Sequence, residues 1–405
     1  MTDQTNTPEL RFPEFKKEWQ CNTLDNCCYK ISDGIHSTPI YSKSGDFSFI
    51  NGNNLINGKI HFENAKLVDS KEALKHKRNL TYNETILLSI NGTIGNIALY
   101  RGEKIILGKS AAYINIKANF LNPLFLYYFL ETNSLQRYFR SELTGTTIKN
   151  LSIKSIKKTK LYIPNITEQR KIGDFFSKLD QQIELEEKKL ELLEQQKRGY
   201  MQKIFSQELQ FKDKVTNNFD NWSEFKIKDI FSKIESGNRL PKSNLLDGDI
   251  PYVIAQTTNN GVYMNISKDT LDYHGNNLKK FKKGSITISI DNPDAMFIQT
   301  QDFVTSNVMR VLYNENLSIE AHTFILYSLR KLTQTYNWSV KFSGPIIMDS
   351  KIKLPVKLNT NDIDWNIVNK IGEFLTKLDF KIYQNTTKVE LLKQRKKGLL
   401  QKMFV

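Results

Sequence analysis

The 405-residue sequence is poor in cysteine and in long hydrophobic runs. Its three cysteines, Cys21, Cys27 and Cys28, cannot all pair within one chain, which suits a reducing compartment. The longest apolar run, residues 120–130, contains Pro123 and is far shorter than the roughly 20 residues that span a bilayer. The first residues form no apolar core typical of a signal peptide. We therefore expect a cytoplasmic protein with no membrane partner.

Motifs for catalysis are also missing. The five histidines show no metal-site spacing, and no glycine-rich loop carries the lysine of a phosphate-binding motif. Residues 291–294 (DNPD) faintly resemble a loop of amino-methyltransferases, but they lack its aromatic residue and are better interpreted as a turn. Residues 349–351 (DSK) lie too far from them to form a nuclease motif except by chance. We expect no catalytic residue, no metal site and no cofactor in this chain.

What the sequence does have is basic charge. Its 58 Lys and Arg outnumber 43 Asp and Glu, a formal net charge of +15. Such an excess favours a polyanionic partner, and nucleic acid is a better candidate than a membrane surface. A hydrophobic content of 39% is ordinary for a globular protein, and the length allows two or three domains.

The chain is an internal duplication with a period of about 200 residues. Residues 18–34 match residues 221–237 at a constant offset of 203, and residues 168–205 match residues 367–404 with 18 identities in 38 positions. This period is too long for a solenoid, so each copy is interpreted as a globular domain followed by a long helix. The predicted parts are residues 1–165 (first globular domain), 166–206 (first long helix), 207–359 (second globular domain) and 360–405 (second long helix).

Both helices carry apolar residues at the alternating 4,3 spacing of a coiled-coil seam. Parallel pairing would bring Lys197 against Lys396, whereas antiparallel pairing would place Glu186 opposite Lys396 and Lys197 opposite Asn385. Antiparallel helices of roughly 50 Å would hold the domains apart, at a separation suited to duplex DNA about one turn apart. Packing of each helix on its own domain is the alternative. The predicted seam comprises Ile172, Leu179, Ile183, Glu186, Leu190, Leu193, Lys197, Ile382, Asn385, Val389, Leu392 and Lys396.

Polar loops in the globular parts offer recognition chemistry. Amides and hydroxyls can read base edges, while cationic side chains and backbone N–H groups beside glycine can contact phosphates. Each loop alone is compatible with an ordinary turn, but similar loops recur in both copies with different residues, as two readers of different sequences would. The candidate DNA-binding residues are Ser32, Gly34, His36, Ser37, Asn51, Asn53, Asn54, Asn91, Lys109, Ser110, Thr146, Lys149, Asn238, Arg239, Lys242, Gln256, Thr257, Thr258, Asn259, Ser306 and Asn307.

Two sequence motifs resemble the specificity subunit of type I restriction–modification systems. They are ELRFPEF (residues 9–15) with Trp19 behind it, and the helix sequence 164–205 with its second copy. The resemblance implies two target recognition domains that read a bipartite double-stranded DNA site with an unread gap, and helices that dock two methyltransferase subunits. It implies adenine methylation with S-adenosylmethionine on those partners. Where two restriction subunits join, it implies ATP- and Mg-dependent cleavage, also outside this chain.

The expected fold is therefore α/β, with two globular domains separated by two long helices in an antiparallel coiled coil, related by a pseudo-two-fold duplication. Two other functions stay open. One is a coiled-coil assembly scaffold with protein-binding domains, and the other is the DNA-recognition subunit of a methyltransferase system that lacks ATP-dependent cleavage. DNA affinity that falls steeply with salt would separate DNA recognition from the scaffold.

Overall fold

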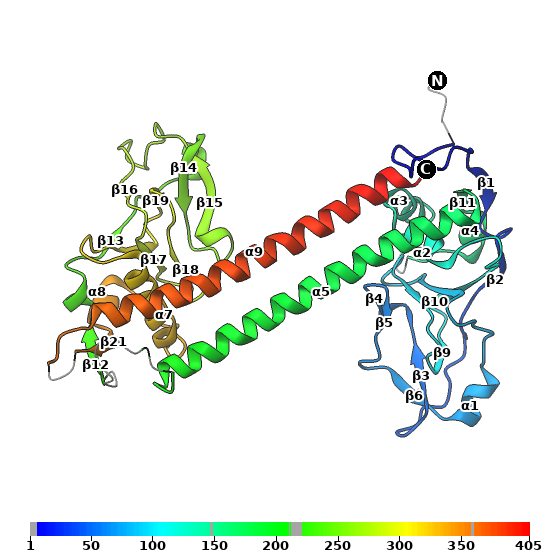
Figure 1. Ribbon diagram of the computed structural model, residues 1–405, viewed down its shortest axis with the longest axis horizontal. Helices are drawn as coiled ribbons and strands as arrows, with labels where there is room; N and C mark the ends of the chain where they lie inside the picture. The colour runs from blue at the N-terminus through cyan, green and yellow to red at the C-terminus, as the bar shows by residue number, and fades with distance from the viewer. Residues whose placement is uncertain (1–5, 146–148, 210, 212–220, 358–359) are drawn as a thin grey trace. The chain divides into compact units, whose positions relative to one another are not determined.

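The structure, a computed structural model, describes residues 6–145, 149–209, 211, 221–357 and 360–405. It divides into two compact units, each made of segments distant in the sequence (Figure 1). Residues 1–188 and 386–405 form the first unit, and residues 189–385 form the second. Each unit contains one globular domain of strands and helices and a stretch of both long helices. The predicted α/β class, with two domains and two long helices, is confirmed.

The globular domain of the first unit is built on two main sheets. In the central sheet, of order β2-β10-β7-β8, every neighbouring pair is antiparallel. In the other, of order β6-β3-β9, β3 pairs antiparallel with β6 and parallel with β9. Two antiparallel pairs, β1-β11 and β4-β5, complete the strands. The strands are β1 (Gln20–Thr23), β2 (Cys28–Asp33), β3 (Phe47–Ile50), β4 (Leu55–Ile56), β5 (Lys59–Ile60), β6 (Lys66–Val68), β7 (Thr85–Ser89), β8 (Ile97–Leu99), β9 (Ile105–Leu107), β10 (Ala111–Ile116) and β11 (Lys160–Ile163).

The longest apolar run of the sequence becomes a buried helix of this domain. Asn122 accepts a hydrogen bond from the N–H of Phe125 at 3.0 Å, and Pro123 occupies the first turn, a favoured start for a helix. Among the described residues, no helix has the length and apolar character needed to cross a bilayer. The helices of this domain are α1 (Ser70–Lys75), α2 (Pro123–Glu131), α3 (Asn133–Ser141), α4 (Ile153–Lys158) and the 3-10 turn η1 (Gly52–Asn54).

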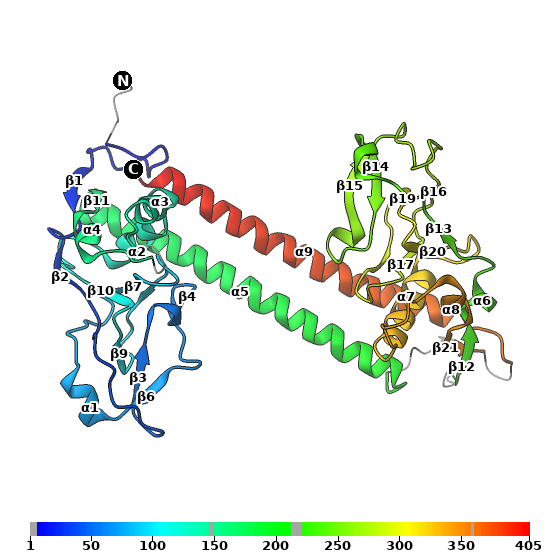
Figure 2. The same ribbon diagram turned by 180° about the vertical axis from the view of Figure 1, so that it is seen from behind.

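The second unit repeats this plan. Its sheets have the orders β13-β20-β17-β18, β15-β14-β19-β16 and β12-β21. From behind, α7 lies against the sheet that contains β17 and β18 (Figure 2). The elements are β12 (Asn221–Lys226), α6 (Ile227–Ile230), β13 (Glu235–Ser236), η2 (Lys242–Asn244), β14 (Asp247–Val253), η3 (Asn259–Gly261), β15 (Val262–Ile266), β16 (Lys280–Phe281), β17 (Ile286–Ser289), β18 (Met296–Ile298), β19 (Phe303–Thr305), β20 (Met309–Leu312), α7 (Ile319–Thr333), α8 (Gly344–Asp349) and β21 (Lys351–Val356).

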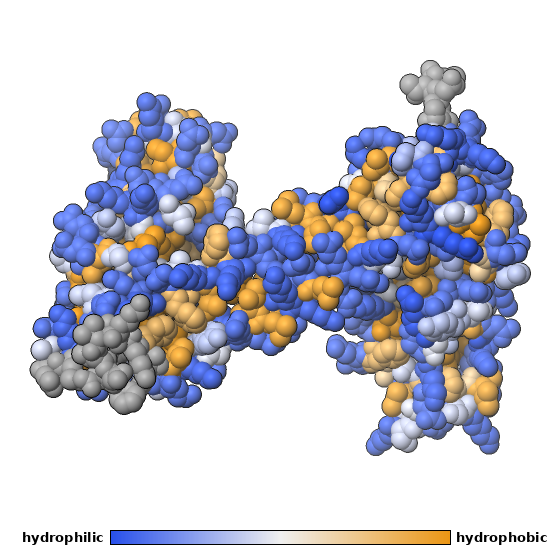
Figure 3. All heavy atoms as spheres, in the orientation of Figure 1, coloured by the Kyte–Doolittle hydropathy of each residue, from blue (hydrophilic) through white to orange (hydrophobic). Residues whose placement is uncertain are grey.

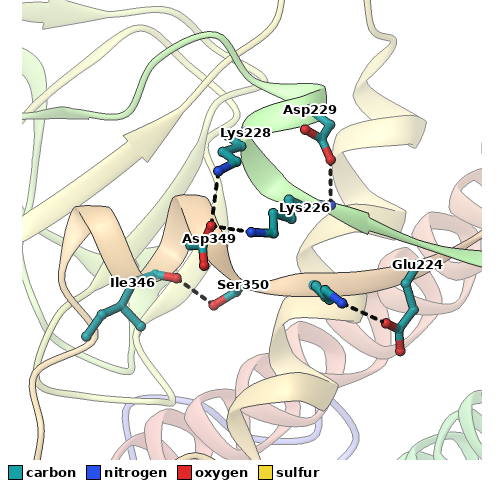
Figure 4. A network of polar contacts seen from close by, with 8 residues as sticks. Glu224, Lys226, Lys228, Asp229, Ile346, Asp349 and Ser350 are labelled. Carbon is teal, nitrogen blue, oxygen red and sulfur yellow. Dashed lines mark hydrogen bonds and ion pairs between the residues drawn. The ribbon is translucent and has the colours of Figure 1, made fainter.

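Ion pairs tie the β12-β21 sheet to its flanking helices (Figure 4). Asp349, at the end of α8, accepts hydrogen bonds from Lys226 at 2.6 Å and from Lys228 at 3.1 Å, and these bonds lower the pKa of the Asp349 carboxyl. Lys351 at the start of β21 lies 3.5 Å from the carboxylate of Glu224 on β12. Asp349 and Lys351 thus hold the β12-β21 sheet and its flanking helices together.

Within each unit the two long helices, α5 (Ile166–Phe205) and α9 (Trp365–Met403), lie antiparallel. In the first unit Phe176 of α5 meets Phe404, just after the end of α9, with ring centres 6.0 Å apart. In the second unit Tyr200 of α5 meets Phe374 of α9 at 5.0 Å. The predicted antiparallel coiled coil is confirmed. Its seam residues Ile172, Leu179, Ile183, Asn385 and Val389 are buried, and Leu190, Leu193, Ile382 and Leu392 are half-buried.

The predicted register of this pair is wrong. Lys396 pairs with Asp180 at 2.8 Å and with Glu131 at 2.8 Å, not with Glu186. Glu186 pairs instead with Lys388. In the second unit Lys197, which was expected to face Asn385, forms an ion pair with Asp379.

The register differs because the prediction considered only partners inside the seam. Asp180 and Asp379 each follow a seam leucine, one position outside the apolar stripe. Each receives a hydrogen bond from a tyrosine of its globular domain, from Tyr128 at 2.8 Å and from Tyr327 at 2.6 Å. The lysine therefore binds a carboxylate that the domain orients, which heptad spacing alone does not reveal.

The contacts of the ELRFPEF motif explain why it occurs together with the helix motif in one sequence. Arg11 donates two hydrogen bonds, of 2.6 and 2.7 Å, to the buried carboxylate of Glu168 in the first turn of α5. The indole N–H of Trp19 donates to the same carboxylate at 3.3 Å. The backbone N–H of Leu10 donates to the carbonyl of Lys402 near the end of α9. The motif thus joins both long helices to the first domain.

Equivalent aromatic clusters anchor one helix end in each unit. Phe404 lies 6.5 Å from Trp19 and 5.2 Å from Phe125, ring centre to ring centre. Phe205, at the end of α5, occupies the equivalent place against Trp222 at 6.2 Å and Phe324 at 5.8 Å. Aromatic pairs at such distances contribute beyond their buried area. The last residue of each duplicated helix sequence is therefore a packing residue.

Candidate nucleic-acid interface

Five predicted loops meet at one end of the central sheet in the first unit. Ile35, which follows Gly34, forms a parallel bridge with Gly108, beside Lys109 and Ser110. The N–H of Gly52 donates to the hydroxyl of Ser110 at 2.9 Å, which brings in the loop of residues 51–54. Asn91 forms a bridge with Asn150, next to Lys149. Loops from five parts of the sequence thus form one polar surface, here called the first loop cluster.

Several predicted DNA-binding residues in this cluster form hydrogen bonds within the protein. Ser110 donates to Oδ1 of Asn51 at 3.0 Å, and Oδ1 of Asn54 accepts the N–H of Asn51 at 2.9 Å. The side-chain amide of Asn54 donates to the carbonyl of His61 at 3.1 Å. These side chains hold the loops in place. The exposed residues around them, His36, Ser37, Asn53, Lys109 and Lys149, are the ones available to a ligand.

The polar centre of the first loop cluster has one unsatisfied atom. The hydroxyl of Thr93 donates to the carbonyl of Gly52 at 3.0 Å and lies 3.2 Å from the hydroxyl of Ser89. Oδ1 of Asn91 is buried and has no hydrogen-bond partner among the described residues. A buried acceptor without a partner is costly unless water or a ligand supplies a donor.

A cavity of about 390 Å³ opens beside the loop of residues 51–54. Its lining includes the half-exposed aromatic ring of Tyr41, and the ammonium of Lys66 lies 4.4 Å from the centre of that ring. His61 and Asn53 contribute polar groups. The sequence analysis identified Asn53 but missed Tyr41 and Lys66, because an isolated tyrosine and lysine carry no signal until the fold brings them together.

The second unit assembles an equivalent second loop cluster. Asn238, which follows Gly237, forms a parallel bridge with Ser306, and the N–H of Ser306 donates to the carbonyl of Val253 at 3.2 Å. The side chain of Gln256 donates to the carbonyl of Val262 at 2.7 Å, so it braces its own loop. The hydroxyl of Ser306 is buried and has no partner among the described residues.

The predicted residues of the second unit differ in exposure. Six of the nine are exposed, and Gln256 is half-buried. The exposed residues are Arg239, Lys242, Thr257, Thr258, Asn259 and Asn307, whereas Asn238 is half-buried and Ser306 is buried. In the first unit Ser32 is half-buried and Gly34 is buried, and Thr146 lies outside the described residues.

Residues that the sequence analysis missed organise the second loop cluster. The buried carboxylate of Asp272 accepts the side-chain amide of Asn238 at 2.9 Å and the N–H groups of His274 and Asn276, each at 2.8 Å. These bonds, chiefly that from Asn276, hold the pKa of the Asp272 carboxyl below its usual value. Tyr273, beside it, is 56% exposed. The sequence Asp-Tyr-His-Gly-Asn (residues 272–276) indicates a turn, but not which loop the turn supports.

The described part of the chain contains no group of three or more His, Cys, Asp or Glu placed to hold a metal ion. The geometry instead offers polar and cationic side chains on loops held by a rigid sheet. Such a surface is suited to recognising phosphates and base edges.

A family model described as the type I restriction modification DNA specificity domain matches residues 16–195 and, a second time, residues 220–392. The chain belongs to this family. The two matches follow the internal duplication and confirm the resemblance to type I specificity subunits. Specificity subunits of this family are generally non-catalytic.

Relatives of known name are specificity subunits of restriction enzymes. The chain is 23% identical over 422 aligned residues to the MjaIX type I specificity subunit of Methanocaldococcus jannaschii, which covers 99% of this chain and 96% of that protein. It is 28% identical over 173 residues to the S.BcgI specificity subunit of a type II restriction enzyme from Heyndrickxia coagulans. That match covers 42% of this chain and only 47% of the relative, about half its length.

The fold also resembles solved specificity subunits. The crystal structure of the S subunit of a type I restriction–modification system from M. genitalium superposes with a TM-score of 0.66 at 19% identity, over 98% of this chain and 99% of that one. A structure described under the assembly and conformational transition of a type I system gives a TM-score of 0.53 at 15% identity, over 95% and 97%. At these identities the likeness concerns the fold.

Proposed function

We propose that this chain is the DNA-reading subunit of a restriction–modification complex and that each unit reads one half of a bipartite duplex target. The observation that carries the proposal is the pair of loop clusters. Each lies at the equivalent end of the equivalent sheet of its unit, beside the equivalent bridge, to Gly108 or to Ser306, and the two clusters present different side chains. A common frame with different exposed residues is what recognition of two different half-sites requires.

Methyl transfer and cleavage are assigned to other subunits. Two methyltransferase subunits with bound S-adenosylmethionine would modify adenine at the target. Two restriction subunits, in systems that have them, would supply ATP- and Mg-dependent cleavage. The part of this chain would be to bind the target and to hold those subunits at it.

Exposed apolar side chains on the long helices support a docking role. Figure 3 shows hydrophobic patches among the hydrophilic residues along these helices. Burying such side chains against a partner is favourable by about 25 cal/mol for each Å². On α5, Leu185 and Leu192 are 66% and 63% exposed, and on α9 the exposed residues are Phe380, Tyr383 and Leu391.

The test is to co-express the chain with a methyltransferase partner and to measure duplex DNA binding as salt is raised. We expect affinity to fall steeply with salt, because cationic side chains displace counterions from phosphates. Sequencing of methylated positions should then reveal two short specific sequences separated by a gap of fixed length. Exchanging residues 207–359 for the equivalent domain of a relative should rewrite one half and preserve the other.

The competing function is a coiled-coil scaffold whose domains bind protein. It predicts no duplex affinity and no sequence-specific methylation in the co-expressed complex. A methylated motif without a gap, or a domain exchange that changes both halves, would contradict reading by two units.

A further inference from the structure

The loops that follow Gly34 and Gly237 occupy equivalent positions in the two units. Each glycine lies so close to a neighbouring strand that a Cβ would approach a carbonyl oxygen, that of Leu107 at 2.1 Å or that of Thr305 at 1.7 Å. The next residue forms a parallel bridge in both cases, Ile35 with Gly108 and Asn238 with Ser306. The second residue after each glycine, His36 or Arg239, therefore occupies the equivalent position in its unit.

In the second unit the backbone around Arg239 is held from both sides. The carbonyl of Arg239 accepts the N–H of Tyr273 at 2.8 Å. Asn238 is fixed through its side chain, which donates to Asp272 at 2.9 Å and accepts the N–H of Lys279 at 2.8 Å. The amide of Asn238 is therefore used within the protein, and the residue beside it is the one presented outward.

The side chain of Arg239 is stacked and has free donors. Its guanidinium carbon lies 4.6 Å from the centre of the Tyr273 ring. Both residues are exposed, and within the described residues the guanidinium makes no hydrogen bond or ion pair. Stacking uses the face of the guanidinium and leaves the N–H groups along its edge free, in a plane that the ring restrains.

The equivalent residue of the first unit has different chemistry. His36 is 72% exposed at its side chain, and its Nε2 lies 2.7 Å from Oδ2 of Asp33. An imidazole that uses one ring nitrogen to bind a carboxylate cannot make the two parallel hydrogen bonds that a guanidinium can. Both residues are thus oriented by a neighbour, but they offer different hydrogen-bonding patterns.

We propose that Arg239, held by Tyr273, reads a guanine in the half-site of the second unit, and that His36 is its counterpart for the first half-site. Arginine donates two hydrogen bonds to O6 and N7 of guanine in the major groove. The phosphate backbone is the same in both halves of a target, so a phosphate contact gives no reason for the residue to differ between units. Base reading does. The inference rests on the proposed function and assigns a residue to it.

The experiment compares methylated motifs of complexes that contain the wild-type chain, Arg239→Ala, Tyr273→Phe or Lys282→Ala. Arg239→Ala should relax one position of one half-site, reducing the preference for guanine there by about 5- to 150-fold. The other half-site should stay unchanged. Tyr273→Phe keeps the stacking ring and should preserve the motif. Lys282 is an exposed cation of the same unit, and Lys282→Ala should leave the motif intact.

Each other outcome has one meaning. If Arg239→Ala weakens methylation equally at all sites without changing the motif, Arg239 is a phosphate contact and the proposal is wrong. An unchanged motif and rate would also overturn it. If the wild-type complex yields no gapped motif, the proposed function itself fails, which this comparison distinguishes from loss of one reader. His36→Ala is the reciprocal experiment and should relax only the half-site read by the first unit.

Discussion

The ammonium of Lys396 lies 2.8 Å from the carboxylate of Asp180, in the first unit. Lys197 and Asp379 form the equivalent ion pair in the second unit. Asp379 is 199 positions after Asp180, and Lys197 is 199 positions before Lys396. In each unit a domain tyrosine donates a hydrogen bond to the aspartate. The helix of one repeat is thereby fixed to the domain of the other repeat through a carboxylate that is already oriented.

A double-mutant cycle on Lys396→Ala and Asp180→Ala should reveal coupling of about 1–3 kcal/mol in the free energy of unfolding. The side chain of Lys396 is only 16% exposed, so its pair is weakly screened by solvent. The matched control is the exposed pair of Lys377 and Glu373, where we expect about 0.3–0.5 kcal/mol. Equal coupling for the two pairs in urea unfolding would contradict the expectation.

Removing Glu168 should destabilise the first unit more than removing the whole ion pair. Glu168→Ala leaves Arg11 and the indole N–H of Trp19 without their acceptor, at a cost of about 3 kcal/mol. Position 367, the match of position 168, carries the buried residue Ile367. Arg11→Met with Glu168→Ile should therefore recover most of the loss. A double variant as unstable as Glu168→Ala would show that the pair itself is required.

The three thiols should differ in reactivity. Burial raises the pKa of Cys27 to about 11 and that of Cys28 to about 12, whereas Cys21 is exposed. At pH 8 iodoacetamide should modify Cys21 in the folded protein and all three after unfolding, as mass spectrometry would report. Because both raised values favour the protonated thiols of the folded state, stability should decline as pH rises from about 9 through 12. Rapid labelling of Cys27 in the native protein would contradict this packing.

A charge on the exposed helix surface should impair assembly without unfolding the chain. Leu185→Asp replaces a side chain that is 66% exposed, so the free energy of unfolding should change by about 0.5 kcal/mol or less. Co-purification with a methyltransferase partner should decrease if this surface is a docking site. The control Gln181→Asp changes an exposed polar residue one turn earlier. An equal effect of both variants would indicate a general charge effect.

The duplication and the helix seam could be predicted from the sequence because they rest on repetition and on a long period. The register could not, because the partner of Lys396 is chosen by Tyr128, a residue of the globular domain 52 positions before Asp180. Heptad spacing contains no information about such a residue. The same reason explains why the pairing of Arg11 with Glu168 was not predicted, although both residues lie in recognised motifs.

The loop clusters were predicted in outline and not in detail. Polar residues beside glycines indicated Arg239 and His36, but also Asn54 and Asn238, whose amides serve the frame. Whether an asparagine braces a loop or faces solvent depends on partners far away in the sequence. Tyr273 was missed because an exposed aromatic residue has no sequence pattern of its own, and its role became evident only from its stacking on Arg239.

The close approach at Gly34 and Gly237 has an evolutionary consequence. Because each glycine fixes where its loop begins, the proposed reading residues at positions 36 and 239 can be substituted while the origin of the loop stays in place. New specificities then become accessible by single mutations that the rest of the domain tolerates. Selection would then act on a few exposed residues, and the two globular domains would diversify independently of one another.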